Sequence, residues 1–339
     1  MINTLEELEE RLSRPSGSLV SFMKGLQGDI IVLGCAGKMG PTLTKMAKRA
    51  VDEAGVSKRI IGVSRFSDPK AREDLENAGV ETIAGDLLDE QFLYDLPNVP
   101  HVIYMAGMKF GSTGNEHMTW AMNTFLPGRV ADKYKQSRIV AFSTGNVYPF
   151  VPIDSGGATE GMQVGPVGEY AQSCLGRERL FEYFSHLNNT PVVIYRLNYA
   201  IDLRYGVLLD VARSVWKETA INLSTGYANV IWQGDANAIA LRSLALCNTP
   251  PELLNVTGAE TVSIEWLAGE FGIIMGRTPQ FIGRPQTTAL LSNASKANKL
   301  FGAPTVSLGQ MIEWTAGWVM AGGEELGKPT HFQVRDGKF

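Results

Sequence analysis

The chain has 339 residues, of which 44% are hydrophobic and 19% are charged, and its formal net charge is −4. This length provides an ample hydrophobic core, and the slight acidity gives no reason to expect binding to nucleic acid or to an anionic membrane. No apolar run approaches membrane-spanning length, and the three cysteines and four histidines form no metal-ligand pattern. We therefore predict a cytoplasmic protein without a metal site or a disulfide framework.

Residues 1–28 precede the first predicted strand and indicate a helical extension. Thr4 and Glu7 form a capping box at the start of a short helix, and Pro15 ends that helix. A second helix is expected to continue as far as Leu26. We expect this extension to pack on the outside of the sheet or on a neighbouring subunit.

The segment Asp29–Gly40 has the sequence DIIVLGCAGKMG. Its four apolar residues, 30–33, predict a strand buried on both faces, and the residues from Pro41 onward predict a helix. Gly34, Gly37 and Gly40 lie between the two. Strand, glycine turn and helix N-terminus together predict a cradle for the pyrophosphate of a dinucleotide.

Five further runs that are mostly apolar continue the pattern. They predict strands over Arg59–Ser64, Val80–Gly85, His101–Gly107, Arg138–Ser143 and Pro191–Arg196. Helical segments separate most of them, which predicts an α/β fold with a Rossmann-like, doubly wound parallel sheet.

The regular alternation ends after the last of these strands. Residues 200–227 and 257–339 predict a smaller substrate-binding domain, whereas 228–256 indicate a return to the dinucleotide-binding domain of residues 29–199. The cleft between the two interleaved domains is expected to hold the substrate. The tail from Gly327 onward is either a frayed terminus or a strap that closes the cleft or a dimer.

Short motifs follow the glycine turn in a fixed order. Asp86–Leu87 follows the third predicted strand, Ala106–Gly107 ends the fourth, and Asn123 lies in AMNTF. FSTGNVYP follows the fifth strand, and GEYAQSCLGRERL begins the next helix. Together these motifs resemble the extended short-chain dehydrogenase/reductase superfamily, of the NAD-dependent epimerase/dehydratase type, over about residues 29–320.

The resemblance implies a nicotinamide cofactor. It assigns cofactor-binding positions to Gly34, Gly37, Lys38, Met39, Gly40, Ser64, Arg65, Asp86, Leu87, Met105, Ala106, Gly107 and Lys109. Relatives that prefer NAD carry an acidic residue at the position of Ser64, and Arg65 is suited to pair with a 2′-phosphate. We therefore favour NADP over NAD, although stacking of Arg65 on the adenine would be compatible with NAD.

The resemblance also implies the catalytic residues. Tyr170 takes the place of the general acid/base, Thr144 that of the catalytic hydroxyl with Ser143 as the alternative, and Asn123 that of the helix asparagine. Cys174 stands where the superfamily has the lysine that lowers the pKa of the tyrosine. An isolated tyrosine titrates near pH 10, which is too high for efficient proton abstraction at neutrality. Lys109 or Arg177 would then have to supply the missing charge, and Cys174 is either a small buried side chain or a reactive thiol.

These inferences predict a nicotinamide-dependent oxidoreductase or epimerase. Its small-molecule carbohydrate substrate would react at a secondary hydroxyl or carbonyl of a sugar, sugar acid or nucleotide sugar. The missing lysine supports an alternative, a non-catalytic dinucleotide-binding regulatory protein. As in relatives, helices over residues 118–135 and 169–187 are expected to form a homodimer interface.

Overall fold

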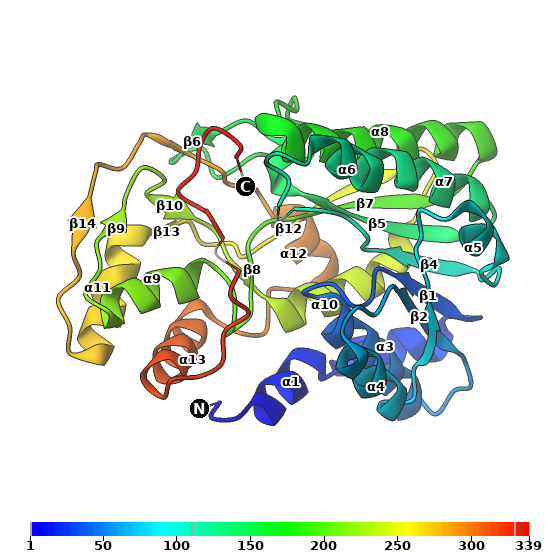
Figure 1. The fold of residues 1–339 in the computed structure, drawn as a ribbon, viewed down its shortest axis with the longest axis horizontal. Helices are drawn as coiled ribbons and strands as arrows, with labels where there is room; N and C mark the ends of the chain where they lie inside the picture. Colours follow the sequence, from blue (N-terminus) through cyan, green and yellow to red (C-terminus); the bar gives the residue numbers. More distant parts are fainter. Residues whose placement is uncertain (1, 110, 329, 339) are drawn as a thin grey trace.

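The computed structural model describes residues 2–109, 111–328 and 330–338. A parallel sheet in the order β12-β7-β5-β4-β1-β2-β3 forms its centre (Figure 1). The seven strands are β1 (Ile30–Leu33), β2 (Ile60–Ser64), β3 (Glu81–Ala84), β4 (His101–Tyr104), β5 (Arg138–Thr144), β7 (Val192–Leu197) and β12 (Glu252–Val256). The strand order reverses between β1 and β4, which is where an open parallel sheet leaves a crevice at its carboxyl edge. This topology confirms the predicted doubly wound sheet.

Side chains of successive strand residues point to opposite faces of the sheet, so each face has its own core. Ile30 and Val32 pack on one side, and Ile31 and Leu33 pack on the other. The helices that contribute to the first core are α2 (Gly17–Gly25), α3 (Gly40–Glu53), α4 (Pro69–Asn77), α10 (Gln233–Arg242) and α12 (Ser295–Phe301). The second core contains residues of α5 (Glu90–Asp95), α7 (Leu126–Lys133) and α8 (Gly168–Asn188). In Figure 1, α8 and α7 lie above the sheet, next to α6 (Glu116–Trp120) and the π-helical turn η1 (Ala121–Phe125) that precede α7.

The N-terminal extension folds against the main domain. Helix α1 (Leu5–Ser13) is capped by Thr4, whose side chain accepts from the Glu7 N–H, as predicted. The reciprocal bond of the capping box is absent, because the Glu7 carboxylate accepts from the Asn3 N–H instead. Arg49 of α3 donates to the Glu10 carboxylate and to the Ser13 hydroxyl. Leu8, on the other side of α1, is fully buried in the core of the smaller domain. Helix α1 therefore lies between α3 and the hydrophobic cluster that contains Leu8.

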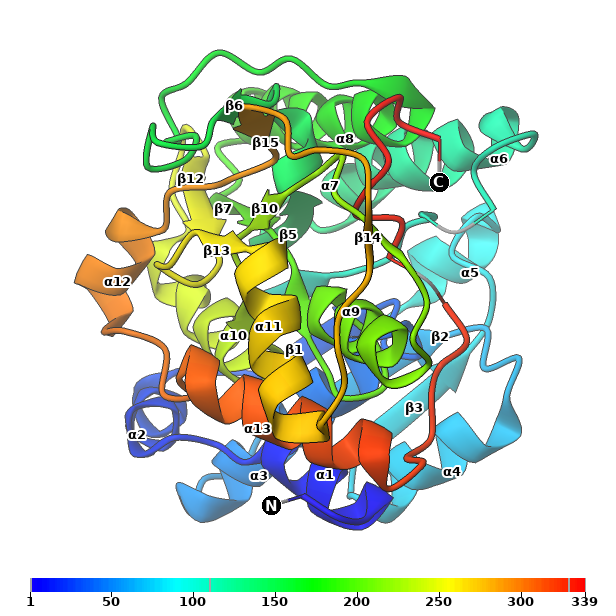
Figure 2. The same ribbon diagram turned by 90° about the vertical axis from the view of Figure 1, so that its left-hand side faces the viewer.

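The smaller domain is built on three helices, which Figure 2 shows side by side. They are α9 (Val207–Trp216), α11 (Ile264–Met275) and α13 (Leu308–Met320). Short two-stranded ladders surround them: β8 (Ala200–Ile201) with β11 (Ile231–Trp232), β9 (Ile221–Asn222) with β14 (Phe281–Ile282), β10 (Tyr227–Ala228) with β13 (Val262–Ser263), and β6 (Val151–Pro152) with β15 (Thr288–Ala289). Two 3₁₀ turns, η2 (Gly145–Val147) and η3 (Ser243–Leu246), complete the elements. No helix within the described ranges is long and apolar enough to cross a membrane.

The C-terminal segment runs across the face of the molecule between the two domains (Figures 1 and 2). The Leu326 N–H donates to the carbonyl of Arg204, and both the N–H and the hydroxyl of Thr330 donate to the Asp210 carboxylate. Near its end, the Arg335 guanidinium donates to Thr288. The described part of the tail is therefore held as a strap, and Pro329 and Phe339 lie outside the described residues.

Candidate active site

The glycine turn after β1 is shaped by two close backbone approaches. Gly34 has φ +91°, and a Cβ there would lie 2.6 Å from the backbone nitrogen of Ala106. A Cβ at Gly40 would lie 2.3 Å from the carbonyl oxygen of Cys35. Gly37 is different, because its Cβ would meet only the Gly34 oxygen at 3.3 Å. Helix α3 begins here without a side-chain cap, so the positive end of its dipole is available to a phosphate.

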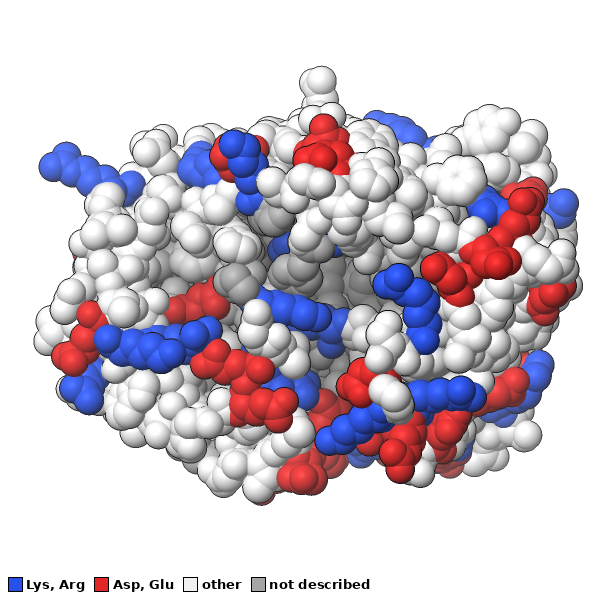
Figure 3. Space-filling model, in the orientation of Figure 1, with Lys and Arg blue, Asp and Glu red and all other residues white. Residues whose placement is uncertain are grey.

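Two cavities adjoin over this turn and share Gly34, Gly37 and Met105 in their walls. The outer cavity, of about 360 Å³, is lined by Ser64, Arg65, Asp68, Asp86, Leu87, Ala106 and Gly107, among others. The inner cavity, of about 250 Å³, is lined by Lys38, Met39, Gly40, Lys109, Ser143, Thr144, Asn146, Tyr170, Asn198, Tyr199, Tyr205 and Thr330, among others. In Figure 3 the same face of the molecule is hollowed at its centre, with Lys and Arg side chains at the edge of the hollow. An elongated ligand such as a dinucleotide, with a different group at each end, fits two adjoining cavities of this kind.

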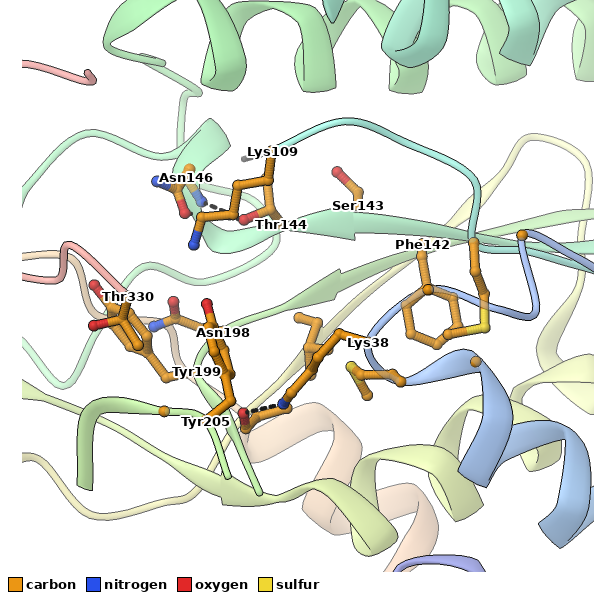
Figure 4. A pocket seen from close by; sticks show the side chains of 18 of the residues that line it. Lys38, Lys109, Phe142, Ser143, Thr144, Asn146, Asn198, Tyr199, Tyr205 and Thr330 are labelled. Atoms are coloured by element: carbon orange, nitrogen blue, oxygen red, sulfur yellow. Dashed lines mark hydrogen bonds between the residues drawn. The ribbon is translucent and has the colours of Figure 1, made fainter. Parts of the chain in front are cut away.

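Tyr170 and Thr144 meet in the inner cavity. Both residues line this cavity, and the side chains of Thr144 and Cys174 lie close enough to the Tyr170 hydroxyl to act on its pKa. Thr144 stands at the end of β5, and its hydroxyl also donates to Asn146 at 3.0 Å (Figure 4). The neighbouring Ser143 hydroxyl donates to Glu178 at 2.5 Å. Of the two predicted hydroxyls, Thr144 is therefore the one in contact with Tyr170.

The positive charge near Tyr170 does not come from position 174, where the superfamily has its lysine. Cys174 occupies that position, is fully buried, and has a thiol pKa raised by burial. Burial also raises the pKa of Tyr170 well above its usual value, whereas the positive charge of Arg177 lowers it. The Arg177 guanidinium donates to the side chain of Asn123 and to the carbonyl of Phe142, each at 2.7 Å. It is thus a fixed cation on the same helix.

Two lysines add charge to the inner cavity. Lys109 Nζ lies 6.0 Å from the centre of the Tyr170 ring, and burial lowers the pKa of Lys109 to about 8. Lys38 Nζ donates to the carbonyl of Ala200 at 3.1 Å and lies 4.6 Å from the centre of the Tyr205 ring. Burial lowers the pKa of Lys38 to about 7.

The model of the NAD-dependent epimerase/dehydratase family matches residues 30–201, which is half of the chain and covers β1 through β8. The chain belongs to this family. Membership makes the protein an enzyme of the NAD-dependent epimerase/dehydratase type with a nicotinamide cofactor. No curated protein matches the chain.

Solved structures of family enzymes share the fold. UDP-glucuronic acid 4-epimerase from Bacillus cereus, in complex with UDP-glucuronic acid and NAD, is 19% identical with a TM-score of 0.69, over 86% of this chain and 99% of that chain. UDP-glucose 4-epimerase from Thermotoga maritima with UDP-glucose is 17% identical with a TM-score of 0.68, over 86% and 98%. The UDP-glucose 4-epimerase from Thermus thermophilus, in complex with NAD, is 18% identical with a TM-score of 0.69, over 85% and 97%.

The structure brings most of the predicted family residues to the two cavities, with two exceptions. Asn123 and Cys174 are buried behind the wall and do not line either cavity. The Asn123 amide donates to the carbonyl of Met108 and accepts from its N–H, each at 2.8 Å, so it holds the loop that carries Lys109. Asn123 is therefore a positioning residue.

Five lining residues of the inner cavity that carry amide or hydroxyl groups were not predicted from the sequence. They are Asn146, Asn198, Tyr199, Tyr205 and Thr330. Asn198 directly follows β7. A polar residue just beyond the carboxyl end of a parallel strand indicates a ligand-binding position, so Asn198 was predictable from the sequence. Thr330 had no such signal, because only the path of the tail brings it to the cavity.

A chain of buried polar groups stands behind Thr144. The Glu178 carboxylate pairs with Arg196 at 2.6 Å, and both side chains are almost fully buried. Arg196 also donates to the Tyr148 hydroxyl at 2.7 Å, and that hydroxyl donates to Asn255 at 2.8 Å. With Ser143 bonded to Glu178, the chain connects α8, β5, β7 and β12. Removing Glu178 or Arg196 would leave a buried charge unpaired, which is strongly destabilising.

Proposed function

We propose that the protein transfers a hydride between its nicotinamide cofactor and a secondary hydroxyl or carbonyl carbon of a sugar, sugar acid or nucleotide sugar. The observation that carries the proposal is the contact between Tyr170 and Thr144 in a cavity that adjoins the glycine turn. The regulatory alternative is not favoured, because the acid/base pair is present although the lysine is absent.

The cofactor, when bound, supplies the site that accepts or returns the hydride. Gly37 and the N-terminus of α3 would hold its pyrophosphate, and the residues of the outer cavity its adenosine end. Tyr170 moves the proton of the substrate hydroxyl, and Thr144 hydrogen-bonds the same oxygen. Arg177 and Lys109 favour the ionised form of Tyr170 in place of the missing lysine.

Replacement of the tyrosine hydroxyl tests this proposal. Tyr170→Phe should lower the rate by about 10²–10⁴-fold, the usual contribution of general acid/base catalysis, while dinucleotide affinity is kept. Tyr183→Phe is the matched control, because Tyr183 lies on the same helix and is 58% exposed. Rates should be measured with a panel of sugars, sugar acids and nucleotide sugars, from dinucleotide absorbance for net oxidation or reduction and from product analysis for epimerisation, which returns the hydride to the substrate. An unchanged rate in Tyr170→Phe would remove Tyr170 from the mechanism.

The preference between NADP and NAD depends on the outer cavity. Arg65 in its wall favours a 2′-phosphate, and Ser64 does not repel one. Asp68 lines the same cavity and would repel that phosphate. Two of the solved epimerase structures named above contain NAD, and none of the three gives support to NADP. The preference for NADP therefore stays a prediction that Ser64 and Arg65 alone support.

We also propose a homodimer through the layer formed by α6, η1, α7 and α8. Large apolar side chains are exposed on these helices: Phe125 is 56% exposed, Tyr183 58% and Leu187 60%. Such side chains, grouped on adjacent helices, suit a symmetric interface with a second copy of this chain.

A further inference from the structure

The charged groups of the inner cavity are all of one sign. Among the described residues that line it, two are lysines, and none is an aspartate or glutamate. In Figure 4, Lys109 enters from above and Lys38 from below, with Asn198 and Tyr205 between them. Two lysines on opposite sides of one cavity produce a positive potential that favours an anionic ligand.

The acidic groups nearby accept hydrogen bonds from other residues. The Asp202 carboxylate, whose charge acts on Lys38, accepts from Arg204 at 2.8 and 3.1 Å, and its side chain is fully buried. Asp210, whose charge acts on Lys109, accepts two hydrogen bonds from Thr330. Lys38 itself contacts a neutral carbonyl and an aromatic ring. An ammonium group with only neutral contacts gains strongly from a bound anion.

Lys38 also faces away from the place expected for the cofactor pyrophosphate. Its backbone belongs to the glycine turn, but its side chain reaches Ala200 of β8 and Tyr205 before α9. Lys38 lines the inner cavity and is not part of the outer cavity wall. Its ammonium group therefore lies on the substrate side of the turn.

We propose that Lys38, with Lys109 across the cavity, binds a carboxylate or phosphate group of the substrate, so that the enzyme acts on acidic sugars in preference to neutral ones. This inference rests on the proposed function, because it places the substrate in the cavity that contains Tyr170. The protonation of the two lysines makes the binding depend on pH. Burial lowers the pKa of Lys38 to about 7 and that of Lys109 to about 8, with Arg204 lowering and Asp202 raising the former. A bound anion raises both values.

Calorimetry on the full chain saturated with dinucleotide tests the proposal. The probes are glucuronate and glucose 1-phosphate, with glucose as the neutral match, so that the two sources of negative charge are separated. At least one of the two anions should bind more tightly than glucose, by about tenfold or more. The advantage should fall as the pH rises from about 6 to 9, because the lysines lose their protons. If neither anion binds better than glucose, the proposal is wrong.

Two variants test whether Lys38 supplies the positive charge that binds the anion. Lys38→Met should remove most of the advantage of the anion, Lys38→Arg should retain it in part, and dinucleotide affinity should stay unchanged in both. Lys70→Met, at an exposed lysine in α4, is the matched control and should behave as the wild type. An advantage that survives in Lys38→Met, or a loss of dinucleotide affinity in that variant, would overturn the assignment.

Hydride transfer is measured separately, so that the two proposals fail independently. Anion binding that depends on Lys38 without turnover of any substrate would support the anion site and contradict the proposed function. Turnover of neutral sugars with no preference for anions would support the proposed function and contradict the anion site.

Discussion

Below about pH 8, where Lys109 is protonated, Lys109→Met should make the ionisation of Tyr170 less favourable. Lys109 Nζ lies 6.0 Å from the centre of the Tyr170 ring. At that distance and an effective dielectric constant of about 20, two unit charges interact by about 3 kcal/mol, or about two pKa units. Lys109 is only half-buried, and solvent screening reduces this to about one unit. A cation favours the phenolate, so its removal raises the pKa of Tyr170.

The assay is the rate with a neutral sugar substrate, measured between about pH 6 and 10. At pH 7, Lys109→Met should lower the rate by about tenfold, which corresponds to about one pKa unit. The loss should disappear above about pH 9, because Lys109 of the wild type is then itself neutral.

Lys133→Met is the matched control. Lys133 Nζ lies 5.8 Å from the centre of the Tyr134 ring, so this change removes a lysine beside a different tyrosine. It should leave the rate at pH 7 unchanged. Equal rates at pH 7 in the wild type and in Lys109→Met would refute the role of Lys109 and leave Arg177 as the cation that acts on Tyr170.

Four further changes test other parts of the site. Gly37→Asp should keep the fold, since its Cβ is nearly free of contacts, but reduce dinucleotide affinity at least tenfold through bulk and like charge, as calorimetry would show. Cys174→Lys should lower the free energy of unfolding by about 3 kcal/mol or more, because it buries an ammonium group beside a fixed cation, whereas Cys174→Ala should cost about 1 kcal/mol in denaturant unfolding. Ser64→Asp with Arg65→Ala should shift the ratio of dissociation constants toward NAD by about tenfold or more. Phe125→Asp should convert a dimer into a monomer in light scattering at micromolar concentration.

Each of these four predictions has an outcome that would contradict it. Unchanged dinucleotide affinity in Gly37→Asp would remove the turn from the cofactor site. A stable Cys174→Lys would mean that this position tolerates charge. A wild type that already binds NAD more tightly than NADP would show the NADP preference to be wrong. Ile273→Asp, on α11 at a side chain that is 79% exposed, is the control for Phe125→Asp, and equal effects would argue against a specific interface.

The sheet was predictable because most of its strands are short apolar runs buried on both faces. Strand β12 was not singled out, since Glu252 and Asn255 interrupt its apolar pattern. The Asn255 side chain is buried and accepts from the Tyr148 hydroxyl, a contact across 107 residues. A buried strand whose polar side chains find hydrogen-bond partners only in the folded state lacks the continuous apolar run by which a buried strand is recognised in a sequence.

The site was predictable where a motif fixes the backbone, as at Gly34 and Tyr170. It was not predictable where long-range packing decides. The direction of the Lys38 side chain depends on Ala200, which is 162 residues away, and the place of Thr330 depends on Asp210, 120 residues away. Asn123 shows the converse. Its motif predicted a catalytic residue, but four side-chain hydrogen bonds to three neighbouring residues hold it behind the cavity wall.

The buried pair of Glu178 and Arg196 has a consequence for how this enzyme can diverge. Each charge is compensated almost entirely by the other, so natural substitution at one position first passes through an unpaired ion in the core. Such intermediates are selected against, and the two positions should change together among descendants of this sequence. An apolar pair of similar volume is an accessible end point, because replacing a whole buried ion pair is often neutral. Ser143 and Tyr148, which bond to the pair, should then covary with it.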